Sequence, residues 1–332
     1  MGTREFTVVI ATAGRPTLLR RTLESLAACA RPAGYAGTAV VENGGREGAE
    51  PIVADFATTL GARYVFVPQG NKSLALNRVM ETLSPDGFVF FTDDDVRFDP
   101  AVLMTYVDAA AADGGGAGRC FGGPTACDYE VQPPEWVRRH FPVSARGWEP
   151  DAAERASPNL SFLGFNWGAF VADLTAAGGF NPDRGPGAKN GATGQESEMQ
   201  SRLRARGVRP VYLPQAWVWH YIPRERSTAE WAIDRAFRHG VQAGMQAPAA
   251  SLRVRGCPLW VYARLAKGAA RVGWARIAGD DAARLAARTT QNYNRGLARG
   301  FRTRDAAMMA APAASQPASQ SPPPALSRTS TS

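Results

Sequence analysis

Residues 6–26 read FTVVIATAGRPTLLRRTLESL, and this stretch decides the fold class. It opens with a short apolar run, Phe6–Ala11, whose length is that of a buried strand. Gly14 and Pro16 then mark a loop and the start of a helix. The leucines that follow recur at helical spacing: Leu18, Leu19, Leu23 and Leu26. The stretch therefore predicts a strand, a loop and a helix, in that order.

The same alternation continues toward the middle of the chain. Further apolar runs at 38–41, 64–67 and 87–92 predict strands, and residues 52–60 and 74–83 predict helices between them. Strands that alternate with helices imply parallel βαβ units. We therefore predict an α/β fold with a doubly wound, mostly parallel sheet flanked by helices.

Polar clusters follow three of the predicted strands. They are residues 12–15, 42–45 and 93–95. Ligands of doubly wound sheets bind at the carboxyl ends of the strands, which is where each cluster lies. The three clusters are therefore expected to meet in one site.

The basic charge of the chain lies in its last quarter. The whole chain of 332 residues has a formal net charge of +8. Residues 251–332 hold 13 Lys/Arg and 3 Asp/Glu, a balance of +10, which leaves −2 for residues 1–250. This distribution argues against a nucleic-acid partner for the core and favours a peripheral contact with an anionic membrane through residues 252–304.

Three segments are expected along the chain. They are an α/β domain over residues 1–250, a basic helical extension over 251–305, and an Ala/Pro/Ser-rich disordered tail over 306–332. No apolar run approaches the length that spans a bilayer, and residues 1–5 lead into a strand without a signal-peptide core. The four cysteines are scattered, without metal or disulfide spacing: Cys29, Cys120, Cys127 and Cys257. We therefore expect a cytoplasmic protein, with a peripheral position at the inner face of the membrane.

The strongest chemical signal is the stretch FFTDDDV, residues 90–96. Three consecutive carboxylates repel one another, and a hard divalent cation that bridges to a diphosphate would compensate them. A solvated acidic turn before the helix near Pro100 is the alternative. A phosphatase of the haloacid dehalogenase type is disfavoured, since Arg97 stands where that class has Thr or Val.

Several segments resemble the inverting family 2 glycosyltransferases of GT-A fold. Residues 7–26 resemble the opening of the family, and residues 40–44 (VVENG) are similar to its second-strand motif, in which an acidic side chain reads the nucleobase. Glu42 stands there, where the family more often has Asp. Residues 71–77 (NKSLALN) resemble the segment before the metal motif, and the Asp triplet occupies the place of the family's Asp-x-Asp.

The resemblance continues downstream, so that it covers residues 6–240. Residues 178–180 (GGF) precede a glycine-rich loop, and residues 194–199 (GQESEM) look like the acidic catalytic segment at a helix start. The base role carries over to Glu196, with Glu198 as the second candidate. Residues 214–220 match the segment where many members hold a His as metal ligand, which here is His220.

The resemblance implies a set of site residues. Asp93 and Asp95 fit the family's Asp-x-Asp best, with Asp94 an alternative ligand, and the cation is assigned to Asp95 and His220. Either Mn²⁺ or Mg²⁺ is expected as the cation. Mn²⁺ is favoured because a His ligand suits it better than Mg²⁺. Acceptor contacts are assigned to Trp167 and Glu198, although Trp167 as a core residue is an equal alternative. The donor-binding set is Thr12, Arg15, Glu42, Asn71, Asn77, Asp93 and Asp94.

The implied function is that of a metal-dependent inverting glycosyltransferase. The donor would be a nucleotide sugar, with UDP- or dTDP-sugars as the default. The acceptor would be a saccharide or lipid-linked hydroxyl in cell-surface polysaccharide or glycoconjugate assembly. The cation would neutralise charge on the leaving diphosphate, and a carboxylate opposite it would take the acceptor's proton.

Two other functions are compatible with this fold. A sugar-nucleotide nucleotidyltransferase would carry a glycine-rich signature after the first strand, where residues 11–15 read ATAGR instead. A catalytically inactive sugar-binding protein would be expected to have lost some of the carboxylates. A dinucleotide dehydrogenase is disfavoured, since no Gly-x-Gly-x-x-Gly follows the first strand.

Overall fold

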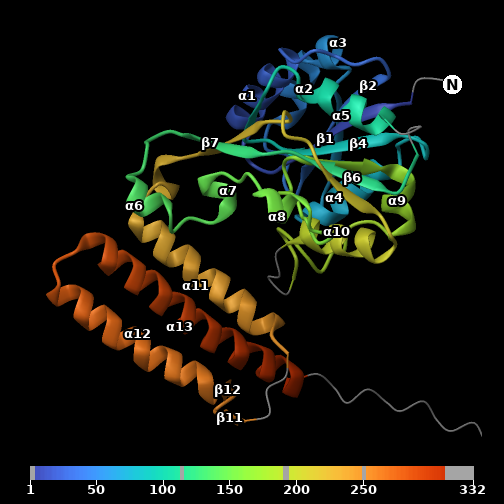
Figure 1. Ribbon diagram of the computed structural model, residues 1–332. Coiled ribbons are helices and arrows are strands. Elements are labelled where there is room, and N and C mark those ends of the chain that lie inside the picture. Colours follow the sequence, from blue (N-terminus) through green and yellow to red (C-terminus); the bar gives the residue numbers. More distant parts are fainter. Residues whose placement is uncertain (1–3, 113–115, 190–193, 249–251, 311–332) are drawn as a thin grey trace, which may run out of the picture.

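The computed structural model of the protein describes residues 4–112, 116–189, 194–248 and 252–310. Its central sheet has seven strands in the order β3-β2-β1-β4-β8-β6-β9 (Figure 1). Their bounds are β1 Phe6–Thr12, β2 Tyr35–Asn43, β3 Arg63–Val67, β4 Phe88–Asp93, β6 Arg119–Gly122, β8 Trp167–Phe170 and β9 Arg209–Tyr212. Strands β3, β2, β1 and β4 are parallel, and β8 runs antiparallel to both β4 and β6. The predicted α/β fold with a mostly parallel sheet is confirmed.

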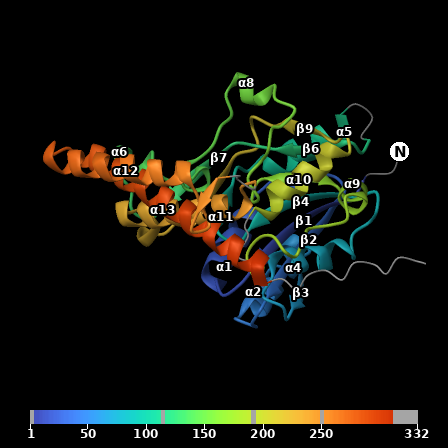
Figure 2. The same ribbon diagram turned by 90° about the horizontal axis from the view of Figure 1, so that it is seen from below.

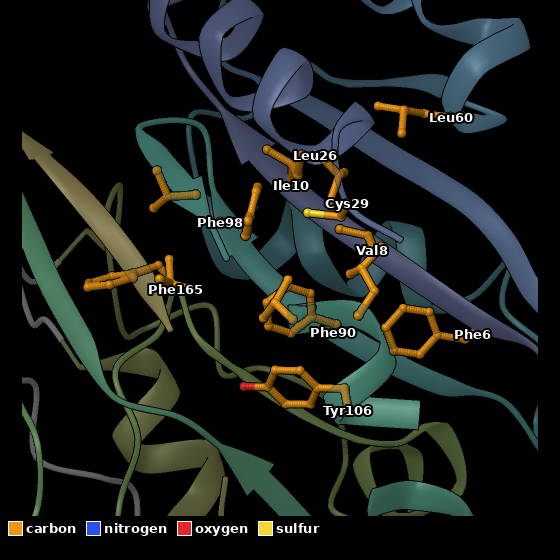
Figure 3. Packing of buried hydrophobic residues seen from close by; sticks show 14 of the residues in the cluster. Phe6, Val8, Ile10, Leu26, Cys29, Leu60, Phe90, Phe98, Tyr106 and Phe165 are labelled. Atoms are coloured by element: carbon orange, nitrogen blue, oxygen red, sulfur yellow. The ribbon is translucent and has the colours of Figure 1, made fainter. Parts of the chain in front are cut away.

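Alternate residues of β1 enter two separate cores. Val8 and Ile10 pack on one face of the sheet with helices α1, α2, α3 and α5 (Figure 3), whereas Val9 and Ala11 pack on the other face with α4, α9 and α10. Because both faces are covered, every residue of β1 is buried, as in strands at the centre of parallel sheets. The helix bounds are α1 Pro16–Ala27, α2 Ala49–Asp55, α3 Ala57–Leu60, α4 Lys72–Met80, α5 Val102–Ala111, α9 Val171–Ala176 and α10 Gln195–Ala205.

A second, three-stranded sheet extends from the end of β4. It has the order β5-β10-β7, in which β10 runs antiparallel to β5 and parallel to β7. Its strands are β5 Val96–Phe98, β7 Thr125–Tyr129 and β10 Val218–Ile222. Three short helices follow β7: α6 Glu135–Arg138, α7 Val143–Arg146 and α8 Ala152–Arg155. Since β5 begins directly after the Asp triplet, this sheet brings β10 beside that triplet.

The C-terminal helices form a layer of their own, here called the helical layer. It consists of α11 Ala229–Gln246, α12 Leu259–Ile277 and α13 Asp281–Ala310, with the hairpin β11 Arg253–Val254 and β12 Cys257–Pro258 directly before α12. Figures 1 and 2 show α13 between α11 and α12, and the layer extends away from the central sheet. The predicted helical extension is confirmed. Helix α13 reaches Ala310, past the predicted start of the tail at 306, and residues 311–332 lie outside the described residues.

Glycines allow α11 and α13 to cross in close contact. A Cβ atom on Gly240 would lie 2.1 Å from the carbonyl oxygen of Tyr293, and one on Gly300 would lie 2.1 Å from that of Val241. No side chain larger than hydrogen fits at such distances. Helix α11, although it precedes residue 250, is therefore packed into the helical layer, and the division of the chain at that residue stays a prediction.

No described helix is long and apolar enough to cross a lipid bilayer.

Candidate active site

The carboxyl ends of β1 and β4 meet through charged side chains, as expected for a doubly wound sheet. Thr12 Oγ1 donates a hydrogen bond of 2.6 Å to Asp94 Oδ2. Arg15, directly before α1, forms ion pairs with both Asp94 and Asp95. Asp94 is fully buried, and this burial raises the pKa of its carboxyl to about 6 despite the opposing charge of Arg15. The predicted residues Thr12, Arg15, Asp94 and Asp95 are thus brought together.

Lys72 completes this cluster, and sequence reasoning did not assign it a role. It is the first residue of α4 and forms an ion pair with Asp93. Burial would lower the pKa of the Lys72 ammonium, but the charges of Asp93 and Glu196 outweigh burial and raise it. The signal that could have found Lys72 is its place at the start of the helix after β3, which puts it at the same edge of the sheet as the Asp triplet.

His220 of β10 faces Asp95. Its Nε2 lies 3.4 Å from Asp95 Oδ1, while its Nδ1 lies 2.6 Å from the carbonyl oxygen of Ser144. A carbonyl only accepts hydrogen bonds, so Nδ1 must carry a proton. The imidazole stacks on Phe165 with ring centroids 4.8 Å apart. The pKa of His220 is raised because its contact with Asp95 outweighs the effect of burial.

The chemistry of this pair suits a divalent cation. Asp95 Oδ1 is buried and accepts no close hydrogen bond from the described residues. In neutral His220, the proton on Nδ1 leaves the lone pair of Nε2 directed at that oxygen. Within the described ranges, no three His, Cys, Asp or Glu side chains gather as a complete metal site. A cation held here would therefore need further ligands, such as phosphate oxygens or water.

Glu196 lies in the first turn of α10, beside the same cluster. Helix α10 begins at Gln195, and Glu196 is half-buried. A Cβ atom on Gly164 would lie 3.1 Å from its side chain, which places that carboxylate against the segment before Phe165. Glu196 also contributes to the raised pKa of Lys72, the ion-pair partner of Asp93, so its charge acts on the same cluster.

Glu198 has a different environment from Glu196. Both of its carboxylate oxygens accept hydrogen bonds from Arg202, at 2.7 and 2.9 Å. Arg202 in turn donates to the carbonyl oxygens of Ala177 and Gly179. Glu198 therefore holds α10 against the segment after α9. The acceptor contact assigned to Glu198 stays a prediction, and it would have to share oxygens that already accept from Arg202.

The prediction that Trp167 stacks on an acceptor sugar is wrong. Trp167 is 1% exposed, and its ring lies 5.0 Å from that of Phe91 and 6.2 Å from that of Phe180. It starts β8, which lies between β4 and β6 and is buried along its whole length. The alternative interpretation, a core residue, describes it correctly.

Glu42 is also buried, which corrects its predicted contact with a nucleobase. It is 1% exposed. Its Oε1 accepts from the backbone N–H of Glu47 at 2.8 Å, and its Oε2 accepts from the Tyr64 hydroxyl. The carboxylate of Glu42 lies under the loop that follows β2. Both oxygens are engaged there.

Asn71 and Asn77 fix the loop after Phe180. Asn71 caps α4 by accepting from the Leu74 N–H at 3.0 Å, and it donates to the carbonyl oxygen of Pro182 at 2.8 Å. Asn77 bonds both the N–H and the carbonyl oxygen of Phe180, at 2.7 and 2.8 Å. These bonds give the two asparagines a supporting role beside the site, and the donor contacts assigned to them stay a prediction.

A hollow of about 320 Å³ lies beside the strand of His220, and no sequence pattern indicated it. Cys127 of β7 is paired in register with His220, and it lines the hollow together with Trp148, which is half-buried. Thr125 also lines it, with a buried hydroxyl that has no hydrogen-bond partner among the described residues. Other residues of the hollow, here called the Trp148 hollow, are Tyr129, Gln132, Arg138, Arg146 and Glu149.

Comparisons with known proteins bear on the family and the fold of the chain. The family model described as "Glycosyltransferase like family 2" matches residues 3–241. The succinoglycan biosynthesis protein ExoM of Rhizobium meliloti (strain 1021) is 26% identical over 191 residues, 54% of this chain and 54% of ExoM. The chain thus matches about half the length of that curated relative.

Solved structures show the same fold at low identity. The mannosyltransferase PcManGT from Pyrobaculum calidifontis, in complex with GDP-Man and Mn²⁺, superposes with a TM-score of 0.56 at 20% identity, over 89% of this chain and 86% of that one. TarS of S. aureus superposes with a TM-score of 0.50 at 13% identity, over 88% of this chain and 55% of that one. The predicted GT-A fold is confirmed by these likenesses.

Proposed function

We propose, from the premise that this chain belongs to the glycosyltransferase-like family 2, that it transfers a sugar from a nucleotide-sugar donor to a hydroxyl acceptor with inversion of the anomeric carbon. Membership of the family makes the chain a glycosyltransferase. The donor, the acceptor, the cation and the stereochemistry are the proposal. The observation that carries it is the grouping of Glu196 and His220 with the Asp triplet at one edge of the sheet.

Asp95 and His220 are the residues that would hold Mn²⁺ or Mg²⁺. The buried, unpartnered Asp95 Oδ1 opposite His220 Nε2 supports this assignment, as does the presence of Mn²⁺ in the PcManGT complex. When bound, the cation would neutralise the charge that develops on the leaving diphosphate. The side chain of Arg15 is 37% exposed, so its guanidinium can turn from Asp94 and Asp95 to a diphosphate oxygen.

Glu196 is proposed as the general base. A hydroxyl is a poor nucleophile, and a carboxylate within hydrogen-bond reach takes its proton as the bond to the sugar forms. Lys72 and the start of α10 place positive charge on the side of the cluster where this carboxylate lies. One displacement of this kind inverts the anomeric centre, because the acceptor attacks opposite the leaving group.

The substrates are proposed by class. UDP- or dTDP-sugars remain the default donors, and the GDP-Man of the PcManGT complex adds GDP-sugars to those worth testing. The acceptor is a saccharide or a lipid-linked saccharide of cell-surface polysaccharide assembly, in keeping with the similarity to a succinoglycan biosynthesis protein. Residues 252–304 make a peripheral contact with the inner face of the membrane, as their basic charge suggests.

Nucleotide release tests the activity. After treatment with a chelator, the protein is incubated with UDP-, dTDP- and GDP-sugars, with and without Mn²⁺. One donor should release its nucleoside diphosphate, only with the cation present, and should raise the melting temperature by mass action. An inactive protein of the same fold would release nothing from any donor. Release without any cation dependence would remove the metal from the proposal.

The Trp148 hollow is proposed to receive the acceptor. Trp148→Ala should leave donor hydrolysis unchanged and raise the acceptor KM about tenfold, equivalent to about 1.4 kcal/mol, because the aromatic surface that lines the hollow is lost. Transfer from labelled donor to a lipid extract of the source cells measures this. Trp217→Ala is the matched control, since Trp217 is also half-buried but does not line the hollow. Equal losses in both variants would place the acceptor elsewhere.

A further inference from the structure

One face of α12 carries a regular stripe of tryptophan and basic residues. Trp260, Arg264, Lys267, Arg271 and Trp274 follow one another at intervals of four, three, four and three residues, which places them on one side of a helix. Trp260 is 47% exposed and Trp274 is 72% exposed, and the three basic residues between them are exposed as well. These five residues are called the α12 stripe.

The adjacent side of α12 makes the packing contacts of the helix. Val261 and Ala275 are buried, and Leu265 packs with Leu297 and Phe301 of α13. Val261 is fully buried and Leu265 is partly buried, so these two apolar residues of the basic extension are engaged within the protein. Within the α12 stripe, one edge of Trp260 also meets Phe301 of α13, with ring centroids 5.9 Å apart, and the rest of the stripe stays exposed after the helical layer has packed.

Exposed apolar side chains concentrate around the stripe. Of the seven large hydrophobic residues that are exposed in the described chain, six lie between residues 252 and 277, and Ile277 is the most exposed at 82%. A hollow of about 520 Å³ opens between α12 and α13, with Arg271 and Trp274 in its lining. Its other lining residues are small: Ala270, Ala275, Ala283, Ala286, Ala287 and Thr290. The surface is thus apolar as well as cationic.

The charge of this surface is of one sign. Helix α12 contains no Asp or Glu over its 19 residues, and its four cations are Arg264, Lys267, Arg271 and Arg276. None of the four forms an ion pair within the described part of the chain. Two copies that met through this face would oppose cation to cation, so the face is unsuited to a symmetric dimer. It is complementary to an anionic surface.

We propose that the α12 stripe docks this protein on an anionic lipid bilayer, with the axis of α12 parallel to the membrane plane. Tryptophan rings settle at the boundary between headgroups and acyl chains, and the cations between them reach lipid phosphates. Figure 1 shows α12 on the outer side of the helical layer, on the far side of α13 from α11. The membrane contact in the proposed function is thereby assigned to one face of α12. This contact does not depend on the chemistry of the active site.

Vesicle sedimentation of the full chain tests the docking surface. Wild-type protein should bind vesicles with about 25% phosphatidylglycerol at least about tenfold more tightly than pure phosphatidylcholine vesicles, and about 0.5 M NaCl should release it. The charge-reversed triple variant Arg264→Glu/Lys267→Glu/Arg271→Glu should lose this preference. The matched control is Arg31→Glu/Arg206→Glu/Arg209→Glu, which changes the net charge equally on exposed residues of the α/β domain and should keep most of the binding.

A second variant and two further measurements make the test decisive. Trp274→Ser should weaken vesicle binding about tenfold and reduce the blue shift of tryptophan fluorescence at saturating vesicles, even if the triple variant folds poorly. Nucleotide release in solution should stay within about twofold of wild type for every variant that folds, which separates failure of this inference from failure of the proposed function. Equal loss of binding in the control triple, or no binding by wild type, overturns the proposal. A wild-type dimer in light scattering that the stripe variants convert to monomers, without vesicle binding, would overturn it in favour of a protein interface.

Discussion

Glu196→Gln is expected to bind donor and cation normally and to transfer sugar about 10²–10⁴-fold more slowly than wild type. Glutamine keeps the shape of the side chain that lies against Gly164, so the first turn of α10 should not move. It removes the group that accepts the acceptor's proton. Calorimetry with the donor and a transfer assay with the acceptor separate these two steps.

Glu198→Gln is the matched control for this prediction. It breaks the ion pair with Arg202, which supports the segment at Ala177–Gly179, so it should lower the melting temperature more than the turnover of folded protein. Near-wild-type transfer by Glu196→Gln would exclude Glu196 as the base. A large loss of turnover in folded Glu198→Gln would then move that role to Glu198.

Asp95→Ala is expected to weaken metal-dependent donor binding by at least about 100-fold, equivalent to about 2.7 kcal/mol. The variant removes the buried oxygen opposite His220 and one of the two partners of Arg15. Titration calorimetry with the donor, with and without Mn²⁺, measures the effect. The gain in affinity that Mn²⁺ gives to wild type should disappear in the variant.

The neighbouring carboxylates provide the controls for Asp95. Asp93→Asn loses the ion pair with Lys72, and Asp94→Asn changes a group already bonded to Thr12 and Arg15. Both should keep part of the response to Mn²⁺. If Asp95→Ala kept the full response while one of these lost it, the main ligand would be Asp93 or Asp94, and His220 would have only a structural role.

The sequence predicted the parallel sheet because local pattern and tertiary packing agree there. β1 is buried on both faces of the sheet, so its sequence is one apolar run. In α1, Leu19, Leu23 and Leu26 recur at helical spacing because they form its single buried face. The carboxyl ends of β1 and β4 could be placed together from topology alone, which is why the pattern already indicated Thr12, Arg15 and the Asp triplet.

Side-chain partners inside the site could not be predicted from the sequence in the same way. The four residues of β8, WGAF, show no alternation that tells an exposed tryptophan from a buried one. The partners of Glu42 come from a later turn and from β3, and the Trp148 hollow is lined by residues on β7 and the segments that follow it. Such contacts depend on how elements distant in sequence pack, which periodicity does not report.

The pairing of Arg15 and Lys72 with the Asp triplet has a consequence for electroneutrality. Asp93, Asp94, Asp95 and Glu196 supply four carboxylates to the cluster, and Arg15 and Lys72 supply two positive charges. The raised pKa of Asp94, about 6, still leaves that group mostly ionised at neutral pH. With His220 neutral, the cluster therefore carries two surplus negative charges, which one divalent ion cancels and one monovalent ion does not. A diphosphate donor would be repelled by the bare cluster and meets a neutral one only after a doubly charged ion has entered.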